Sequence, residues 1–204
     1  MSKLLRPQGY ITSDFSNEEE YRNNPHTGID WKYGFKKSCY ALHDGVVYKV
    51  VGKNNPDLQV YRNIYQLCET EFGLVEIAYV HCWDMRVEDN DFVMAGQPIY
   101  TEGNSGVYVY QGGIQVKPEE KPSGKGAHSH ISVRPVEKTK KLIAGHYLNN
   151  SKGDKYRDNE GNYYRIKNEN DMKGWVDYKS YLYTPTKDQL LIQFKKVLGF
   201  IRHF

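Results

Sequence analysis

Short β-branched segments bounded by turn residues recur along this chain, and they constrain its fold more than any other feature. Residues 45–52 read GVVYKVVG, a β-branched run between two glycines, and residues 74–81 read LVEIAYVH. Segments of this length and composition are typical of strands. Further strands are expected at 91–100, 107–116 and 128–135. A turn interrupts the first of these segments, and the last ends at a proline. The pattern predicts a chain of strands and turns rather than a helical bundle.

The segments between and after these strands have a different character. Residues 53–64 are polar and rich in turn residues, whereas 155–167 is typical of a hairpin with an Asn-Glu-Gly turn. After Thr184, Pro185 suits the first helical position, and helical spacing is then followed by Leu190, Leu191, Phe194, Val197, Leu198 and Ile201. We therefore expect an amphipathic C-terminal helix over 184–204, which could also contact a protein partner.

Composition excludes several classes of protein. With 39% hydrophobic and 26% charged residues and 18 tyrosines in 204 residues, the chain is polar but able to form a core. No run approaches the roughly 18–20 apolar residues of a membrane span, and the first residues lack the apolar core of a signal peptide. A net charge of +3 is too small for a nucleic-acid-binding stripe. The three cysteines have no CxxC spacing, so buried thiols are expected rather than disulfides.

Two histidine motifs contain the residues best suited to metal chemistry. His26 and Asp30 flank a glycine turn in HTGID, and His128 and His130 are two residues apart in HSH. On a strand, that spacing places both imidazoles on one face. His81 ends a predicted strand. Taken singly, each motif also occurs in polar turns or packed cores; His43, His146 and His203 are interpreted as ordinary surface or packing residues.

One carboxylate and two imidazoles form a three-ligand set that suits catalytic zinc and leaves a fourth position open. Bound zinc makes hydroxide available near neutral pH. The remaining histidines could then move protons or stabilise an oxyanion.

In this order, the motifs resemble those of the M23 family of zinc metallopeptidases, the lysostaphin- and LytM-type enzymes that cut bacterial peptidoglycan. The matching segments are HxGxD at 26–30, YVHC at 79–82, GNSG at 103–106 and HSHISVR at 128–134. The similarity covers about residues 8–135, with a weaker match up to 182. The resemblance implies an antiparallel β-sheet domain over 1–183, with a groove walled by loops, an insertion at 107–127 and an extension at 136–183.

Carried over residue by residue, the resemblance implies that His26, Asp30 and His130 bind zinc and that His81 and His128 are catalytic. The implied reaction is hydrolysis of a peptide bond in the stem or cross-bridge of peptidoglycan. The insertion separates the GNSG turn from the HSH motif and is expected to enlarge a groove wall.

Two alternatives remain open: a catalytically inactive wall-binding module, and a structural component of a bacteriophage. All five site residues are present, which favours the enzyme. Lacking a signal peptide, it is expected to be made in the bacterial cytoplasm and to reach the wall through a holin, as a phage lysin, or as part of a virion.

Overall fold

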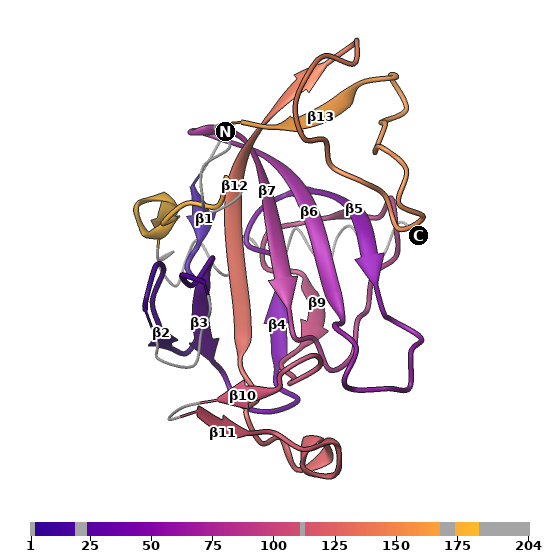
Figure 1. Ribbon diagram of the computed structural model, residues 1–204. Coiled ribbons are helices and arrows are strands. Elements are labelled where there is room, and N and C mark those ends of the chain that lie inside the picture. The colour runs from indigo at the N-terminus through magenta and orange to yellow at the C-terminus, as the bar shows by residue number, and fades with distance from the viewer. Residues whose placement is uncertain (1–2, 19–23, 111–112, 168–173, 184–204) are drawn as a thin grey trace.

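A large antiparallel sheet organises the molecule (Figure 1). The computed structural model describes residues 3–18, 24–110, 113–167 and 174–183. Among these residues, eight strands form one sheet in the order β2-β3-β12-β7-β6-β5-β8, with β13 added on β12. The strands are β2 (Tyr10–Ser13), β3 (Ile29–Lys32), β5 (Gly45–Val51), β6 (Asn63–Thr70), β7 (Gly73–Val80), β8 (Phe92–Val93), β12 (Ser129–Thr139) and β13 (Tyr163–Ile166).

Smaller elements surround the sheet. Two antiparallel pairs join β4 (Ser38–Tyr40) to β9 (Pro98–Thr101) and β10 (Val109–Tyr110) to β11 (Ile114–Gln115), and one parallel pair joins β1 (Leu4–Leu5) to β14 (Leu182–Tyr183). The 3-10 helices are η2 (Pro118–Ser123) and η3 (Lys179–Tyr181). This architecture confirms the predicted mainly β, antiparallel fold class.

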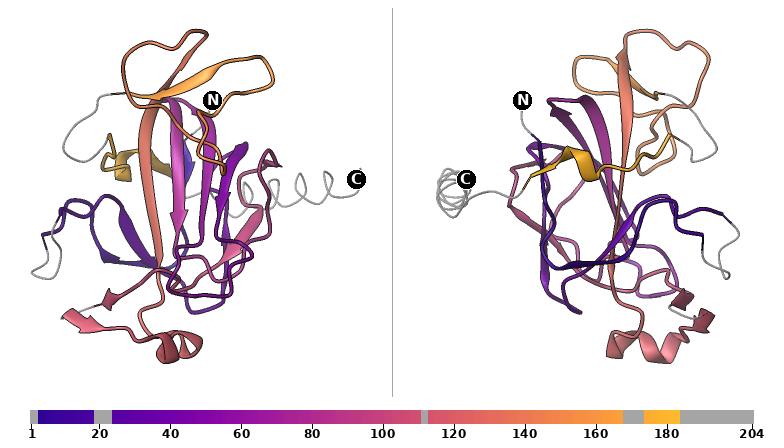
Figure 2. Two further views of the ribbon diagram at one scale, coloured as in Figure 1. Left: turned by 45° about the vertical axis from the view of Figure 1, so that its right-hand side comes forward. Right: turned by 90° about the vertical axis from the view of Figure 1, so that its left-hand side faces the viewer.

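The two faces of the large sheet have different coverings. Side chains alternate along each strand, so the residues of one face share a parity. One face packs against β4 and β9 to form the main core, with Ile64, Ile77, Tyr79, Ile99, Tyr100 and Ile131 buried. On the other face, the extension covers one end with a second cluster: Tyr48, Leu67, Val136, Leu148, Tyr156 and Tyr164. The insertion, with β10, β11 and η2, lies at the opposite end of the sheet (Figures 1 and 2).

Most of the predicted strands are present. The segments expected at 45–52, 74–81, 91–100 and 107–116 correspond to β5, β7, the β8–β9 pair and the β10–β11 pair. The prediction that a strand ends at Pro135 is wrong, because β12 continues to Thr139. The antiparallel partner of β12 changes at the proline. Up to Pro135 the partner is β7, and from Val136 onward it is β13. A change of partner accommodates the missing proline N–H at this point.

Two further regions test the sequence interpretation. Strand β6 is absent from the predicted set, because the polar residues Asn63 and Gln66 interrupt its apolar pattern. Both are buried; the Gln66 side chain donates to the His43 carbonyl (2.7 Å) and accepts from the Tyr79 hydroxyl (2.8 Å). The hairpin expected over 155–167 forms around a turn at 158–161, which the Gly161 N–H closes onto the Asp158 carbonyl (2.9 Å). The helix predicted over 184–204 lies outside the described residues.

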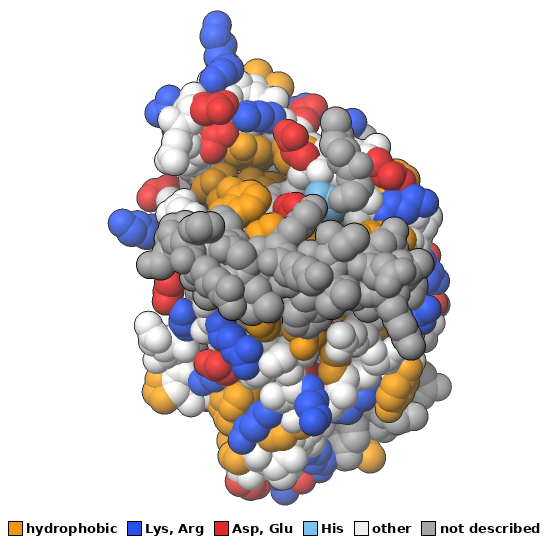
Figure 3. Space-filling model, turned by 180° about the vertical axis from the view of Figure 1, so that it is seen from behind, with side chains coloured by type: hydrophobic (Ala, Val, Ile, Leu, Met, Phe, Trp, Pro, Cys, Tyr) orange, Lys and Arg blue, Asp and Glu red, His pale blue; other side chains and the backbone are white. Residues whose placement is uncertain are grey.

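The surface fits the small net charge. Seen from behind, Lys and Arg side chains are interspersed with Asp and Glu over the coloured part of the surface (Figure 3). The three cysteines are free and buried, as expected. In the described part of the chain, no helix is long and apolar enough to cross a membrane.

Candidate active site

Three of the five predicted site residues converge at the start of β12. Asp30 on β3 and His130 on β12 are directly paired across the antiparallel ladder, and His26 lies in the loop before β3. The Nε2 atom of His26 lies 3.1 Å from Asp30 Oδ1 and 2.9 Å from His130 Nδ1. The distance from His130 Nδ1 to Asp30 Oδ1 is also 2.9 Å. The three groups therefore face one common point.

Gly28 makes this convergence possible. A Cβ at this position would lie 2.5 Å from the Ile131 carbonyl oxygen and 2.7 Å from His130 Nε2. Such distances are well inside van der Waals contact, so only glycine lets the loop pass this close to β12. The glycine in HxGxD is thus required by packing, while the histidine and aspartate on either side supply the polar atoms.

Hydrogen bonds on the far side of each imidazole determine which nitrogen faces the common point. His26 Nδ1 donates to the Asp14 carbonyl (2.7 Å), and His130 Nε2 lies 2.8 Å from Ser132 Oγ, to which it can donate. A neutral imidazole carries one N–H, so these bonds leave lone pairs on His26 Nε2 and His130 Nδ1, facing the Asp30 carboxylate. Three electron-rich atoms this close repel one another unless a cation lies among them.

The donor set fits zinc. Ligands at zinc bond lengths of about 2.0–2.1 Å are about 3.3 Å apart at tetrahedral angles. The observed separations of 2.9–3.1 Å are slightly shorter than this. Two imidazole nitrogens and one carboxylate oxygen are typical of a catalytic zinc site, and second hydrogen bonds such as those to Asp14 and Ser132 typically orient metal ligands.

The local electrostatics keep Asp30 and His130 in their metal-binding protonation states. Although burial raises the pKa of Asp30, the nearby His128 and the adjacent imidazoles of His130 and His26 hold it well below its ordinary value. Desolvation lowers the pKa of His130, against the opposing effect of Asp30. Asp30 is therefore ionised and His130 neutral at pH 7, as metal binding requires.

The other two predicted residues, His81 and His128, lie next to this group. Their ring centroids are 4.6 Å apart in an edge-to-face arrangement, and that of His81 is 6.0 Å from that of His130. His81 follows β7 with a positive φ of 66°, and its Nδ1 donates to the Ser105 carbonyl (2.7 Å). His128 Nδ1 donates to the Gly126 carbonyl (2.8 Å), and its Nε2 lies 3.6 Å from Asp30 Oδ1.

These bonds leave Nε2 of both imidazoles available for chemistry. Desolvation, reinforced by the neighbouring His128 and His130, holds the pKa of His81 well below its ordinary value. His81 is therefore neutral at pH 7 and has a lone pair on Nε2. His128 can donate a hydrogen bond from Nε2 only when it is protonated, and Asp30 is then its nearby counter-charge.

A groove of about 360 Å³ opens over the histidines. Its floor is the sheet face that also carries the second cluster, which we call the Tyr-rich cluster after Tyr48, Tyr156 and Tyr164. Its walls come from separate loops. It is lined by Thr27, Tyr61, Asn63, Tyr65, Ala78, Val80, His81, His130, Ser132 and Trp175. A cleft lined by apolar, aromatic and a few polar groups beside a reactive cluster is typical of a substrate site.

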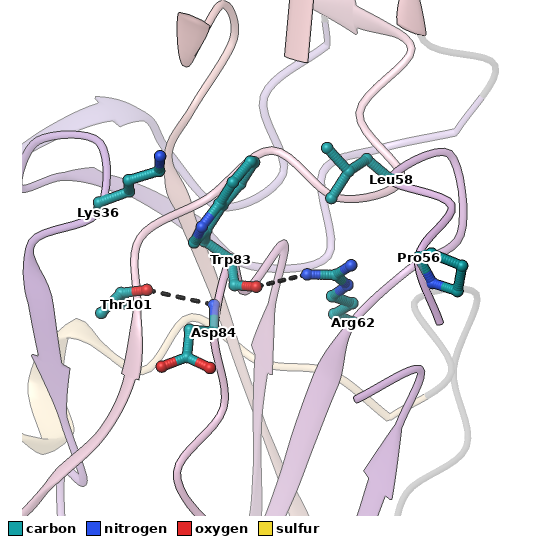
Figure 4. A pocket seen from close by; sticks show the side chains of 7 residues that line it. All are labelled: Lys36, Pro56, Leu58, Arg62, Trp83, Asp84 and Thr101. Carbon is teal, nitrogen blue, oxygen red and sulfur yellow. Dashed lines mark hydrogen bonds between the residues drawn. The ribbon is translucent and has the colours of Figure 1, made fainter. Parts of the chain in front are cut away.

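A larger hollow, of about 560 Å³, lies nearby around Trp83 (Figure 4). The Trp83 carbonyl accepts a hydrogen bond from Arg62 Nη1 (2.6 Å), and the Asp84 N–H donates to Thr101 Oγ1 (3.2 Å). Among the described residues that line this hollow, none is one of the five predicted site residues. The smaller groove, which contains His81 and His130, is therefore the candidate substrate site.

The sequence interpretation missed the residues that support the histidines. Asp14 and Ser105 act through backbone carbonyls, which carry no signal in residue type. Ser132 could have been found, because it lies two residues after His130 on the same face of one strand. Tyr61, whose ring centroid is 5.5 Å from that of His81, was missed as well. It lies in the 53–64 segment, whose composition indicated only a polar, turn-rich loop.

No protein-family model matches the sequence, and no curated protein sequence matches it significantly. Several solved structures are similar to it. The catalytic domain of the prophage-encoded M23 protein EnpA from Enterococcus faecalis, in a single-substitution mutant form, is 20% identical, with a TM-score of 0.46 over 65% of this chain and 85% of that one. The antimicrobial peptidase lysostaphin from Staphylococcus simulans is 17% identical, with a TM-score of 0.46 over 66% of this chain and 48% of that one.

A crystal structure of Csd3 from Helicobacter pylori is 14% identical, with a TM-score of 0.47, and the match covers 98% of this chain and 42% of that one. The chain therefore spans less than half of the lysostaphin and Csd3 chains that it matches. The chain is thus similar, at low identity, to the M23 protein EnpA and to part of the peptidase lysostaphin.

Proposed function

We propose that this chain is an M23-type zinc endopeptidase that hydrolyses peptide bonds in bacterial peptidoglycan. The observation that carries the proposal is the convergence of His26, Asp30 and His130 beside the paired rings of His81 and His128. These five residues come from motifs far apart in the sequence, and two of them, His81 and His130, line a groove. The order of the motifs supports peptidoglycan as the substrate.

In the proposed mechanism, the histidines have separate roles. His26, Asp30 and His130 would hold the zinc ion, which when bound supplies Lewis-acid polarisation of an oxygen atom. His81, neutral with its Nε2 lone pair free, would accept a proton from the attacking water. His128, in its protonated form, would donate from Nε2 to the oxygen of the scissile carbonyl as negative charge develops there. The groove would hold the peptide in an extended conformation across the sheet face.

The test combines metal analysis with digestion of purified peptidoglycan. We expect about one zinc per chain and release of new amino termini. Replacing His81 or His128 by Ala should lower the rate at least about 100-fold while zinc is retained, because each removes a proton-transfer or oxyanion-stabilising group. His130→Ala should lose the metal, whereas His146→Ala, a histidine outside the site, should change neither property.

Two outcomes would contradict the proposal in different ways. A His81→Ala/His128→Ala double variant that still cleaves the wall would refute the assigned roles. A wild-type chain that binds zinc but releases no amino termini from several wall types would instead indicate a binding module.

A further inference from the structure

The insertion at 107–127 contains a lysine whose side chain is completely buried. Lys121 lies in η2 and is 0% exposed. Lysine is almost never fully buried unless its ammonium group is bound by other polar groups. The Lys121 ammonium group must therefore be bound by polar groups within the fold.

The Lys121 ammonium group binds the backbone of the GNSG turn and of Val107, the residue that follows it. Its Nζ donates to the carbonyl oxygens of Asn104 (2.9 Å) and Val107 (2.7 Å) and lies 5.5 Å from the centre of the Tyr108 ring. Asn104, also 0% exposed, returns two hydrogen bonds from its side-chain amide, to the carbonyls of Lys121 (3.0 Å) and Lys125 (2.8 Å). The insertion and the turn are thus joined by reciprocal hydrogen bonds in a buried setting.

The same turn positions both histidines of the proposed catalytic pair. The carbonyl of Ser105, which lies between the two carbonyls that Lys121 binds, accepts the Nδ1–H of His81 (2.7 Å). The carbonyl of Gly103 accepts the backbone N–H of His128 (3.0 Å). A small displacement of the turn would therefore move the acceptor that fixes the tautomer of His81.

A second anchor holds the turn on its other side. The backbone N–H of Arg62 donates to Ser105 Oγ (3.0 Å), and the Arg62 carbonyl accepts the N–H of Cys82, next to His81 (3.0 Å). The Arg62 guanidinium itself is bound to the carbonyls of Trp83 and Asn55 (Figure 4 shows the first of these bonds). Arg62 and Lys121 together constrain the turn from two separate segments of the chain.

We propose that Lys121 is a positioning residue for catalysis, which holds the Ser105 carbonyl where it keeps His81 in the Nδ1–H tautomer. This inference rests on the proposed function, in which His81 Nε2 accepts a proton. Burial lowers the pKa of Lys121 to about 8, so the group is mostly charged at neutral pH and its N–H donors are retained. The insertion thereby gains a role in the site, although none of its described residues lines the groove over His81 and His130.

The experiment compares zinc-loaded wild type with Lys121→Met, which keeps the apolar stem and removes the ammonium group. We expect kcat to fall about 10- to 100-fold with little change in KM, because misplacement of a reacting group affects the rate more than binding. Zinc content should be unchanged. Imidazole ¹⁵N shifts should show a single Nδ1–H tautomer of His81 in wild type and a tautomer mixture in the variant. Lys117→Met, an exposed lysine of the same insertion, should match wild type in every measurement.

A shorter replacement, Lys121→Gln, retains N–H donors and should give intermediate kcat and tautomer ratios; it also serves if Lys121→Met does not fold. The proposal is overturned if either folded variant keeps wild-type kcat and a single Nδ1–H tautomer, or if His81 of wild type has its proton on Nε2. If wild type cleaves no peptidoglycan, the proposed function fails, while the ¹⁵N spectra still test the contact between Lys121 and the turn.

Discussion

One face of the large sheet is divided into two halves with opposite properties, although β6, β7 and β12 run through both. At one end the face is open, and it presents the groove with His81 and His130. At the other end the extension covers it with the Tyr-rich cluster, in which Leu148 and Tyr48 are only 1% and 2% exposed. We call these the groove half and the covered half.

A largely buried ion pair lies between them, in which the Glu76 side chain is 0% and the Arg134 side chain 14% exposed. Arg134 on β12 and Glu76 on β7 face each other across the ladder and form a salt bridge. Glu76 also accepts a hydrogen bond from the Tyr48 hydroxyl (2.6 Å), and the Arg134 guanidinium lies over the Trp175 ring (4.3 Å). Tyr48 belongs to the covered cluster and Trp175 lines the groove, so the pair connects the two halves.

One sheet thus separates stability from chemistry along its strands. In the groove half, the cluster of the extension does not cover the face, and hydrogen bonds fix imidazole orientation. In the covered half, aromatic and aliphatic side chains exclude water and contribute burial energy. Changes in the covered half should therefore alter the free energy of unfolding with little effect on the site.

Breaking the connecting ion pair should have the largest effect on stability. Arg134→Ala leaves the carboxylate of Glu76, which is 0% exposed, without its counter-charge. Removing one partner of a buried pair typically costs about 3–5 kcal/mol. We expect that loss in the free energy of unfolding, measured by urea denaturation.

Replacing both partners provides the control. In Arg134→Met/Glu76→Gln, the charge is gone and the amide oxygen still accepts from Tyr48. Since an apolar or neutral replacement of a buried pair is often close to neutral, this variant should recover most of the lost stability. A cost below about 1 kcal/mol for Arg134→Ala would show that the pair does not connect the halves energetically.

Truncating the core of the covered half should have the next largest effect. Leu148→Ala removes a side chain that is 1% exposed, for which a loss of about 2–4 kcal/mol is usual. The rate of wall cleavage per folded molecule should stay at the wild-type value. Leu142→Ala, a leucine of the same extension that is 49% exposed, should change the unfolding free energy by less than about 0.5 kcal/mol. A large fall in kcat for Leu148→Ala would contradict the division of the sheet.

The sequence predicted the groove half better than the covered half. The five site residues lie in compact motifs whose spacing reflects the geometry: Asp30 and His130 are cross-strand partners, and Gly28 is required by close approach. Strand β6 escaped prediction because the buried Gln66 and Asn63 resemble surface residues in sequence. Gln66 is hydrogen-bonded to the His43 carbonyl and the Tyr79 hydroxyl, which come from elsewhere in the fold, and Asn63 to the Tyr65 hydroxyl on the same strand. Residue type alone could not indicate that these two side chains are buried.

The packing of the extension was also beyond the sequence. Its tyrosines are spaced irregularly. The Arg157–Tyr163 bridge brings Tyr164 beside Tyr156, with ring centroids 5.5 Å apart, and only the pairing of β13 with β12 joins them to the large sheet. The role of Lys121 was hidden for a related reason. A lysine in a charged Pro/Gly segment reads as a solvated side chain, and its two acceptors are backbone carbonyls, which no motif encodes.

The smallest predicted effect is a pH dependence confined to the covered half. Burial raises the pKa of Asp158, but hydrogen bonds from the side chain and backbone of Asn162 and from the Tyr164 hydroxyl outweigh it and hold the pKa below its ordinary value. A carboxyl whose pKa is depressed by folding stabilises the protein above its unfolded pKa of about 3.9, and that stability is lost as the pH falls through the folded value.

Asp158→Asn should therefore be less stable than wild type at pH 7 by roughly 1.5 kcal/mol, the worth of a hydrogen bond to a charged group. The difference should shrink below about pH 4, because the unfolded state of wild type then binds a proton that the native carboxylate, with its lowered pKa, does not bind, whereas the amide of the variant binds none in either state. Thermal unfolding of both proteins between about pH 7 and pH 2.5 measures this, with the exposed Asp154→Asn as the matched control. If the difference is independent of pH, Asp158 stabilises the hairpin through shape alone, and the covered half depends on its apolar contacts without support from this charge.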